Sequence, residues 1–114
     1  MEKIKKYQII LEKILNKHAK VKADNMPLVK SRVIIDQAKR HFILMDMGWS
    51  HIGFIHNWVF HFELIGDKVH LHDNSTDFDI IEELVEYGIA KTDMVISVLE
   101  EPDFDENGKL KEAA

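Results

Sequence analysis

The sequence predicts an α+β fold: an N-terminal helix, a four-stranded antiparallel meander, a second helix and a short C-terminal strand. Apolar residues first recur at helical spacing, then alternate as in strands over four consecutive segments, and then return to helical spacing. The connections between the four strand segments are too short to hold crossover helices. An antiparallel sheet with helices on one side is therefore expected, rather than a Rossmann-type sheet.

The first segment, residues 2–19, is predicted to be an amphipathic helix. Its apolar side chains recur every three or four positions and form one stripe that would face the core. Residues 23–27 follow as a linker, with Asn and Pro as helix breakers. The predicted core stripe consists of Ile4, Tyr7, Leu11, Ile14, Leu15 and His18.

Four strands are predicted next, and Gly66-Asp67 is a two-residue turn of the kind that joins antiparallel strands. Residues 49–53 are predicted to be a loop that carries Trp49. The predicted strands are residues 28–36, 41–47 (closed by Gly48), 54–65 and 68–73.

The second helix is predicted over residues 79–87, with an N-cap among residues 74–77 and Gly88 at its end. Residues 94–99 form the last predicted strand. The side chains expected to face inward from this helix are Ile80, Ile81, Leu84 and Val85.

Length and composition indicate one domain, residues 1–102, followed by a mobile or docking tail, residues 103–114. The chain has 114 residues, 46% of them hydrophobic, and no cysteine, which excludes disulfides and thiolate chemistry. No segment has the length of a signal peptide's apolar run or of a membrane span. We expect a soluble, cytoplasmic protein.

Charge is unevenly distributed along the chain. The formal net charge is −5, yet residues 1–22 hold seven lysines and two glutamates, a local +5, whereas residues 73–106 hold twelve acids and one lysine. Five lysines share one face of the first helix. They form either a solvated flank or a basic stripe for nucleic acid or an acidic partner, and both interpretations stay open. The lysines of this stripe are Lys3, Lys6, Lys13, Lys17 and Lys20.

The hairpin around Gly66-Asp67 carries the most distinctive pattern. A two-residue turn would place Glu63 opposite His70 and His61 opposite His72. Because side chains alternate across a sheet, these four polar residues would share one face. The opposite, core face would hold Phe60, Phe62, Leu64, Val69 and Leu71.

Three interpretations of His61, Glu63, His70 and His72 follow from their residue types. The first is an ordinary polar sheet face with a Glu63–His70 pair, and the second is a surface buried in an oligomer or partner interface. The third is a metal or acid–base site, since imidazole and carboxylate groups bind Zn²⁺ and titrate near neutral pH. His56 is predicted to lie on the core side with Phe54, Trp58 and Phe60. Trp49 is either a packed loop residue or an interface contact.

Motifs of catalysis are missing from the sequence, which holds no glycine-rich phosphate loop, no nucleophile elbow and no HExxH helix. We therefore expect a non-enzymatic regulatory protein without a cofactor, acting through protein–protein contacts and forming a homo-oligomer. The candidate contact residues are Trp49, His61, Glu63, His70, His72 and the acidic tail.

The order of residues between about positions 3 and 102 resembles the XisI-like family, the fdxN-element excision controlling factors. The resemblance depends on an ordered set of short matches rather than on one motif. They are Asp36, residues 41–44, Gly48-Trp49, His61, Glu63, Lys68, Thr76-Asp77, Glu83-Leu84, Gly88, Lys91, Asp93 and residues 94–96.

This resemblance implies a small cyanobacterial accessory protein that supports the excision of a DNA element. It would act with a second, nuclease-like accessory protein and a site-specific recombinase, without being the recombinase. The chain departs from the family pattern at His70, His72, Gly66-Asp67 and Ala90, and its C-terminal end is acidic where the family's is basic and aromatic.

Overall fold

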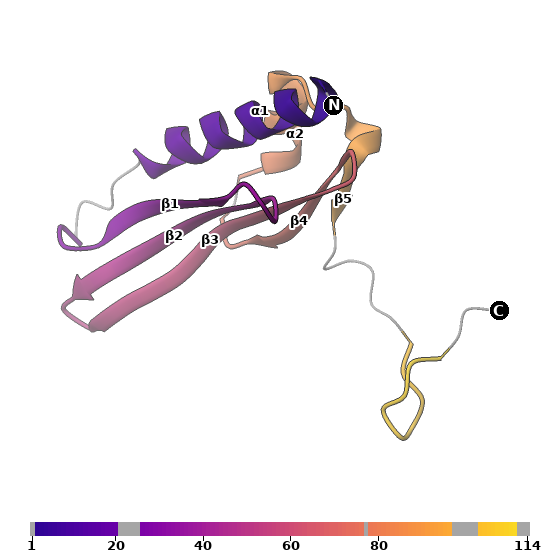
Figure 1. The fold of residues 1–114 in the computed structure, drawn as a ribbon. Helices are drawn as coiled ribbons and strands as arrows, with labels where there is room; N and C mark the ends of the chain where they lie inside the picture. Colours follow the sequence, from indigo (N-terminus) through magenta and orange to yellow (C-terminus); the bar gives the residue numbers. More distant parts are fainter. Residues whose placement is uncertain (1, 21–25, 77, 97–102, 112–114) are drawn as a thin grey trace.

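The computed structural model describes residues 2–20, 26–76, 78–96 and 103–111. The predicted α+β class is confirmed, with two helices packed on one face of a five-stranded sheet (Figure 1). The elements are α1 (Glu2–Ala19), β1 (Lys30–Asp36), β2 (His41–Ser50), β3 (Gly53–Ile65), β4 (Lys68–Asn74), α2 (Ile80–Tyr87), the 3-10 helix η1 (Lys91–Asp93) and β5 (Met94–Ile96).

The sheet has the strand order β1-β2-β3-β4-β5, so each strand pairs with its neighbour in sequence. The first four strands form the predicted antiparallel meander. Strand β5 pairs in parallel with β4, because α2 carries the chain back along the sheet between them. Residues 97–99 of the predicted last strand, and residues 23–25 of the predicted linker, lie outside the described residues.

One core joins α1, α2 and the helix side of the sheet. All five residues predicted for the core face of the hairpin are buried, and Phe60 and Phe62 are fully enclosed. The predicted helix stripe is also confirmed, with Ile10 added to it. On α2, Ile80 and Leu84 are buried, but the prediction for Val85 is wrong, since its side chain is 40% exposed.

Strand β2 does not end at Gly48, as the sequence suggested. It continues through Trp49 to Ser50, and the loop is reduced to a turn at residues 51–52. Gly48 instead allows the backbone at Leu28 to pass close to β2, because a Cβ at position 48 would lie 2.0 Å from the carbonyl oxygen of Leu28. Leu28 itself belongs to a turn, in which the Val29 N–H donates to the Met26 carbonyl, so β1 begins two residues later than predicted.

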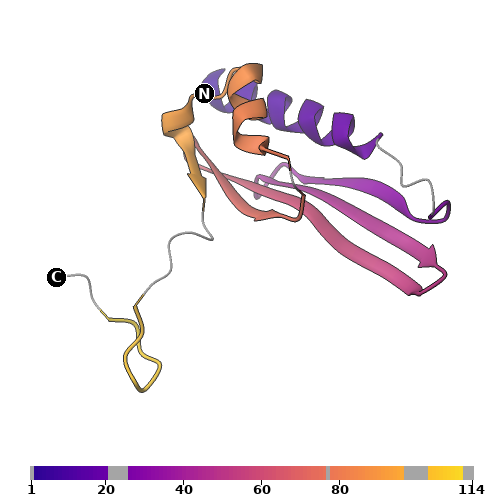
Figure 2. The same ribbon diagram turned by 180° about the vertical axis from the view of Figure 1, so that it is seen from behind.

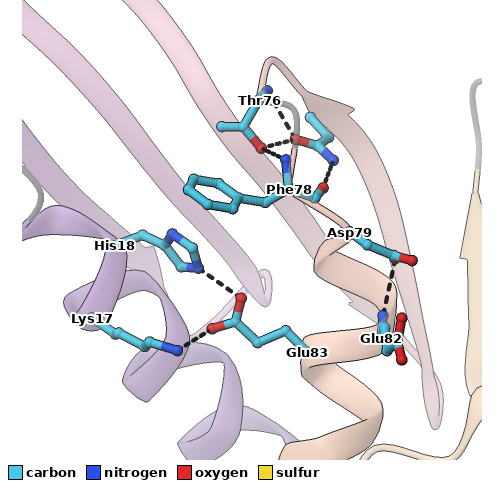
Figure 3. A network of polar contacts seen from close by, with 8 residues as sticks. Lys17, His18, Thr76, Phe78, Asp79, Glu82 and Glu83 are labelled. Atoms are coloured by element: carbon cyan, nitrogen blue, oxygen red, sulfur yellow. Dashed lines mark hydrogen bonds and ion pairs between the residues drawn. The ribbon is translucent and has the colours of Figure 1, made fainter.

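The N-cap of α2 is Asp79, whose carboxylate accepts from the Glu82 N–H, and not a residue of 74–77. Asn74 and Thr76 instead stabilise the preceding turn, where the Asn74 side chain accepts from the Thr76 N–H and the Thr76 hydroxyl accepts from the Phe78 N–H (Figure 3). Asp77 lies outside the described residues. Gly88 ends the helix in the left-handed conformation, as predicted.

Within the tail, residues 103–111 form a small turn closed by a bridge between Phe104 and Leu110. The Asp105 carboxylate accepts from the N–H groups of Asn107 and Lys109. Both apolar side chains of this turn remain more than half exposed.

Candidate functional site

The face of the sheet opposite the helices is the candidate functional site, and we call it the outer face. Both views place α1 and α2 on the same side, so nothing in the described part of the chain covers the other side (Figures 1 and 2). Strand alternation and pairing register assign the outward side chains. The apolar ones are Ile34, Ile43, Met45, Met47, Trp49, Phe54, Trp58, Ile65 and Val95.

A β-bulge between β2 and β3 brings aromatic residues to the outer face. Leu44 pairs with Phe60 and Met45 pairs with Trp58, so Val59 is the extra residue. Val59 packs against the core, and Trp58 points to the opposite side, with its ring 5.4 Å from that of His61. The prediction that Phe54, His56 and Trp58 share the core side with Phe60 is therefore wrong, since all three are exposed.

Trp49 belongs to an aromatic row at the far end of the outer face. Its ring lies 5.3 Å from Phe54, which in turn stacks on His56 at 6.5 Å. The side chains of Trp49, Phe54 and Trp58 are 62%, 51% and 41% exposed. Such a row of large exposed rings is typical of binding surfaces.

A second bulge, between β3 and β4, changes the predicted hairpin register. Glu63 pairs with His70 as expected, but His61 pairs with Asp73, and His72 becomes the extra residue. His72 nevertheless stays on the outer face, where its Nε2 lies 2.8 Å from Glu63 Oε1. Because of the bulge, the Glu63 carboxylate contacts the side chain of His72 and not that of the predicted partner, His70.

These side chains form a chain of polar contacts across three strands, which we call the histidine chain: His72, Glu63, His41 and His61. Glu63 Oε2 lies 3.6 Å from His41 Nε2, and His41 Nδ1 lies 2.9 Å from His61 Nε2. His41, at the start of β2, was missed by the sequence analysis. His41 lies beside Glu63 because the two residues pair across β2 and β3. The sequence pattern of the β3–β4 hairpin alone gives no indication of that pairing. His70 flanks the chain, with its ring 6.1 Å from His72.

The electrostatics of the histidine chain favour a neutral His61 beside an ionised Glu63. The hydrogen bond from His72 lowers the pKa of Glu63, and the neighbouring imidazoles add to this. Partial burial lowers the pKa of His61, and so does its proximity to His72 and His41. The ring nitrogens of His41 and His61 bond to each other, and no three His, Asp or Glu side chains of the described residues converge as a metal site requires.

A second polar network lies on the helix side and was also missed. Buried Asp93 accepts a 2.6 Å hydrogen bond from the Tyr7 hydroxyl and pairs with Lys3 at 2.6 Å and Lys68 at 3.3 Å. The Tyr7 hydroxyl also accepts from the Ala90 N–H. These contacts tie α1 to η1 and β4.

A third network joins the two helices (Figure 3). The Glu83 carboxylate binds Lys17 at 2.7 Å and His18 at 2.9 Å, and the His18 ring packs between Phe60 and Phe78. Lys17 and Lys3 belong to the lysine stripe of α1. Two of its five lysines are thus engaged within the protein, which weakens the hypothesis of a continuous DNA-binding stripe.

Comparison with known proteins now identifies the family. The model of the XisI protein family matches residues 1–105. The chain belongs to the XisI family. The solved structure of a XisI-like protein from Anabaena variabilis is 32% identical, covers 85% of this chain and 87% of its own, and superposes with a TM-score of 0.76.

A second solved structure, the fdxN element excision controlling factor XisI from Anabaena variabilis, shares the fold. It is 22% identical, covers 82% of this chain and 90% of its own, and has a TM-score of 0.68. None of the curated proteins matches the chain. No helix of the described residues is long and apolar enough to span a bilayer.

Proposed function

We propose that this XisI-family chain is a non-enzymatic accessory protein in the excision of a DNA element. In this proposal it acts through protein–protein contacts with a second, nuclease-like accessory protein and, through that protein, with a site-specific recombinase. Membership of the family supports the role, and the name of the related excision controlling factor supports the process. Work on chromosomal DNA in a bacterium would place the protein in the cytoplasm.

The outer face is the observation that carries the contact mode. A sheet with helices on one side only leaves its other side to water, and polar residues normally occupy it. Here that side holds three exposed large aromatic rings together with isoleucine and methionine residues. We assign the contacts to Trp49, His61, Glu63, His70 and His72 as predicted from the sequence, and add Phe54, Trp58 and His41.

In this proposal the histidine chain organises the outer face for binding. A general base or a metal ligand needs a nitrogen or oxygen lone pair directed at a substrate or ion. In the histidine chain, the two carboxylate oxygens of Glu63 and the facing nitrogens of His41, His61 and His72 are directed at one another. The arrangement fixes the side chains of one face, as a binding surface requires.

An excision reporter tests the proposal. Cells would carry the element between its recombination sites, the recombinase and the second accessory protein, with or without this chain. We expect excision to depend on the chain, and the tagged chain to retain the accessory protein during purification. The double variant Trp49→Ser and Phe54→Ser should lose both effects, whereas Ile9→Ser on the solvent side of α1, equally exposed at 55%, should keep them. Excision at the same level without the chain, combined with no retained protein, would refute the proposal.

A further inference from the structure

We propose that the partner seated on the outer face is a second copy of this chain, in a sheet-to-sheet homodimer. The inference rests on the proposed function, which assigns the protein's contacts to the outer face. It specifies that the molecule bound directly to this face is a second copy of the chain. The second accessory protein would then bind the dimer rather than the isolated outer face.

The size of the outer face fits a stable dimer. Five strands, the longest of 13 residues, span the sheet. With about 4.8 Å between strands and about 3.3 Å per residue, strands of 7, 10, 13, 7 and 3 residues present on the order of 600 Å². A standard stable interface buries about 800 Å² on each partner. One copy facing another would therefore cover nearly the whole face with a surface of the same shape and extent.

The charge of the outer face argues for a partner like itself. The chain as a whole carries −5, but the outer face holds three basic residues, Lys30, Arg32 and Lys68, against Asp36, Glu63 and Asp73. A face this close to neutral offers little to DNA or to a strongly charged protein. A two-fold interface brings a patch against its own copy, so the patch must be self-complementary, and a nearly neutral patch avoids repulsion between like charges.

Met45 is buried although it lies on the outer face. It is 6% exposed, and among the described residues it is the one buried apolar residue that does not belong to the core between sheet and helices. In the register it lies between Arg32 and Trp58. Around this buried centre, Ile34, Trp58 and Phe54 remain 43%, 41% and 51% exposed, which leaves a rim of apolar surface for the partner copy to cover.

Light scattering after size exclusion, at micromolar concentrations, is the primary test. The wild-type chain should scatter as twice its mass of 13.3 kDa. Phe54→Glu places a charge in the interface and should raise the dimer dissociation constant at least about 30-fold, the effect of one interface hot spot. The control Ile9→Glu changes an equally exposed residue on α1 and should stay dimeric.

A thiol footprint gives a second readout that does not depend on a disruptive substitution. The chain contains no cysteine, so Ile34→Cys and Ile9→Cys each introduce a single thiol. The thiol at position 34 should be alkylated more slowly as the protein concentration rises and the dimer forms, while the thiol at position 9 should react at one rate throughout.

The outcomes separate this inference from the proposed function. A wild-type monomer that still retains the accessory protein overturns the dimer and leaves the proposed function standing. A dimer that survives Phe54→Glu and leaves position 34 reactive also overturns it, because the copies then meet elsewhere. A monomer that binds no partner defeats both, and a concentration-dependent dimer that Phe54→Glu alone disrupts supports the inference.

Discussion

The Tyr7 hydroxyl donates a 2.6 Å hydrogen bond to the Asp93 carboxylate, a contact between residues 86 positions apart. It joins the first turns of α1 to the element that leads into β5, so the two ends of the domain hold each other in place. Burial raises the pKa of Tyr7, which keeps its hydroxyl protonated and able to donate.

Tyr7→Phe should lower the free energy of unfolding by about 1–3 kcal/mol, the usual cost of removing a hydrogen bond to a buried charged group. The ring still fills its place in the core, so no cavity contributes to the loss. Urea denaturation followed by circular dichroism measures the change. The control Tyr87→Phe, at a 40% exposed position, should change stability by less than about 0.5 kcal/mol; equal effects at both positions would contradict the role of the Asp93 contact.

Acid should weaken the same contact. Hydrogen bonds from Lys3 and Tyr7 hold the pKa of Asp93 well below its ordinary value of 3.8. The unfolded chain therefore takes up a proton that the folded protein resists, so this stabilisation is complete above pH 3.8 and is lost as the pH falls below it. Asp93→Asn should be less stable at neutral pH, and its unfolding midpoint should fall less steeply than that of the wild type in acid. Parallel pH profiles for the two proteins would contradict this explanation.

Glu83→Gln should loosen the contact between α1 and α2 by about 1–2 kcal/mol. Although burial opposes it, hydrogen bonds from Lys17 and His18 lower the pKa of Glu83, so the carboxylate is the anion that both partners need. Most of the loss should come from His18, whose side chain is 9% exposed, since Lys17 is 55% exposed and surface pairs contribute little. Thermal unfolding of Glu83→Gln and of Glu82→Gln, its exposed neighbour, compares the two; a larger loss at Glu82 would contradict this assignment.

The sequence was sufficient to predict the elements and the core face because both depend on local periodicity. Residues such as Phe60, Phe62 and Leu71 repeat at the strand period, and Gly66-Asp67 fixes the first rungs of the hairpin. Those rungs agree with the prediction as far as the pairing of Phe62 with Leu71. The same reasoning located the helices and the glycine that ends α2.

The two bulges account for what the sequence did not predict in the candidate site. A bulge inserts one residue and reverses the alternation beyond it, and nothing in the local pattern marked Val59 or His72 as the extra residue. For this reason Trp58 lies on the outer face and not on the predicted core side. His41 joined the histidine chain through a strand pairing that spans more than one hairpin, as Tyr7 joined Asp93 across almost the whole chain.

His61 should titrate below its ordinary pKa of 6.5, because burial and the nearby His72 and His41 disfavour its charged form more than Glu63 and Asp73 favour it. As the pH falls below 6.5 the unfolded chain binds a proton at this position before the folded protein does, so folded stability falls. Histidine NMR titration measures the pKa directly. In His72→Asn the pKa of His61 should rise toward 6.5, and an unchanged titration would mean that the two rings do not interact.

Gly48→Ala should be more damaging than Gly53→Ala, although both glycines have positive φ angles, 151° and 132°. The conformation alone costs about 1–3 kcal/mol for a residue with a side chain. At position 53 nothing lies within 4 Å of an added Cβ, so the cost should end there. At position 48 the Cβ would meet the Leu28 backbone at 2.0 Å, and displacing it should cost about 1–3 kcal/mol more. Chemical denaturation of both variants decides the point: similar losses would mean that the segment at Leu28 moves aside readily and does not hold the end of β2 in place.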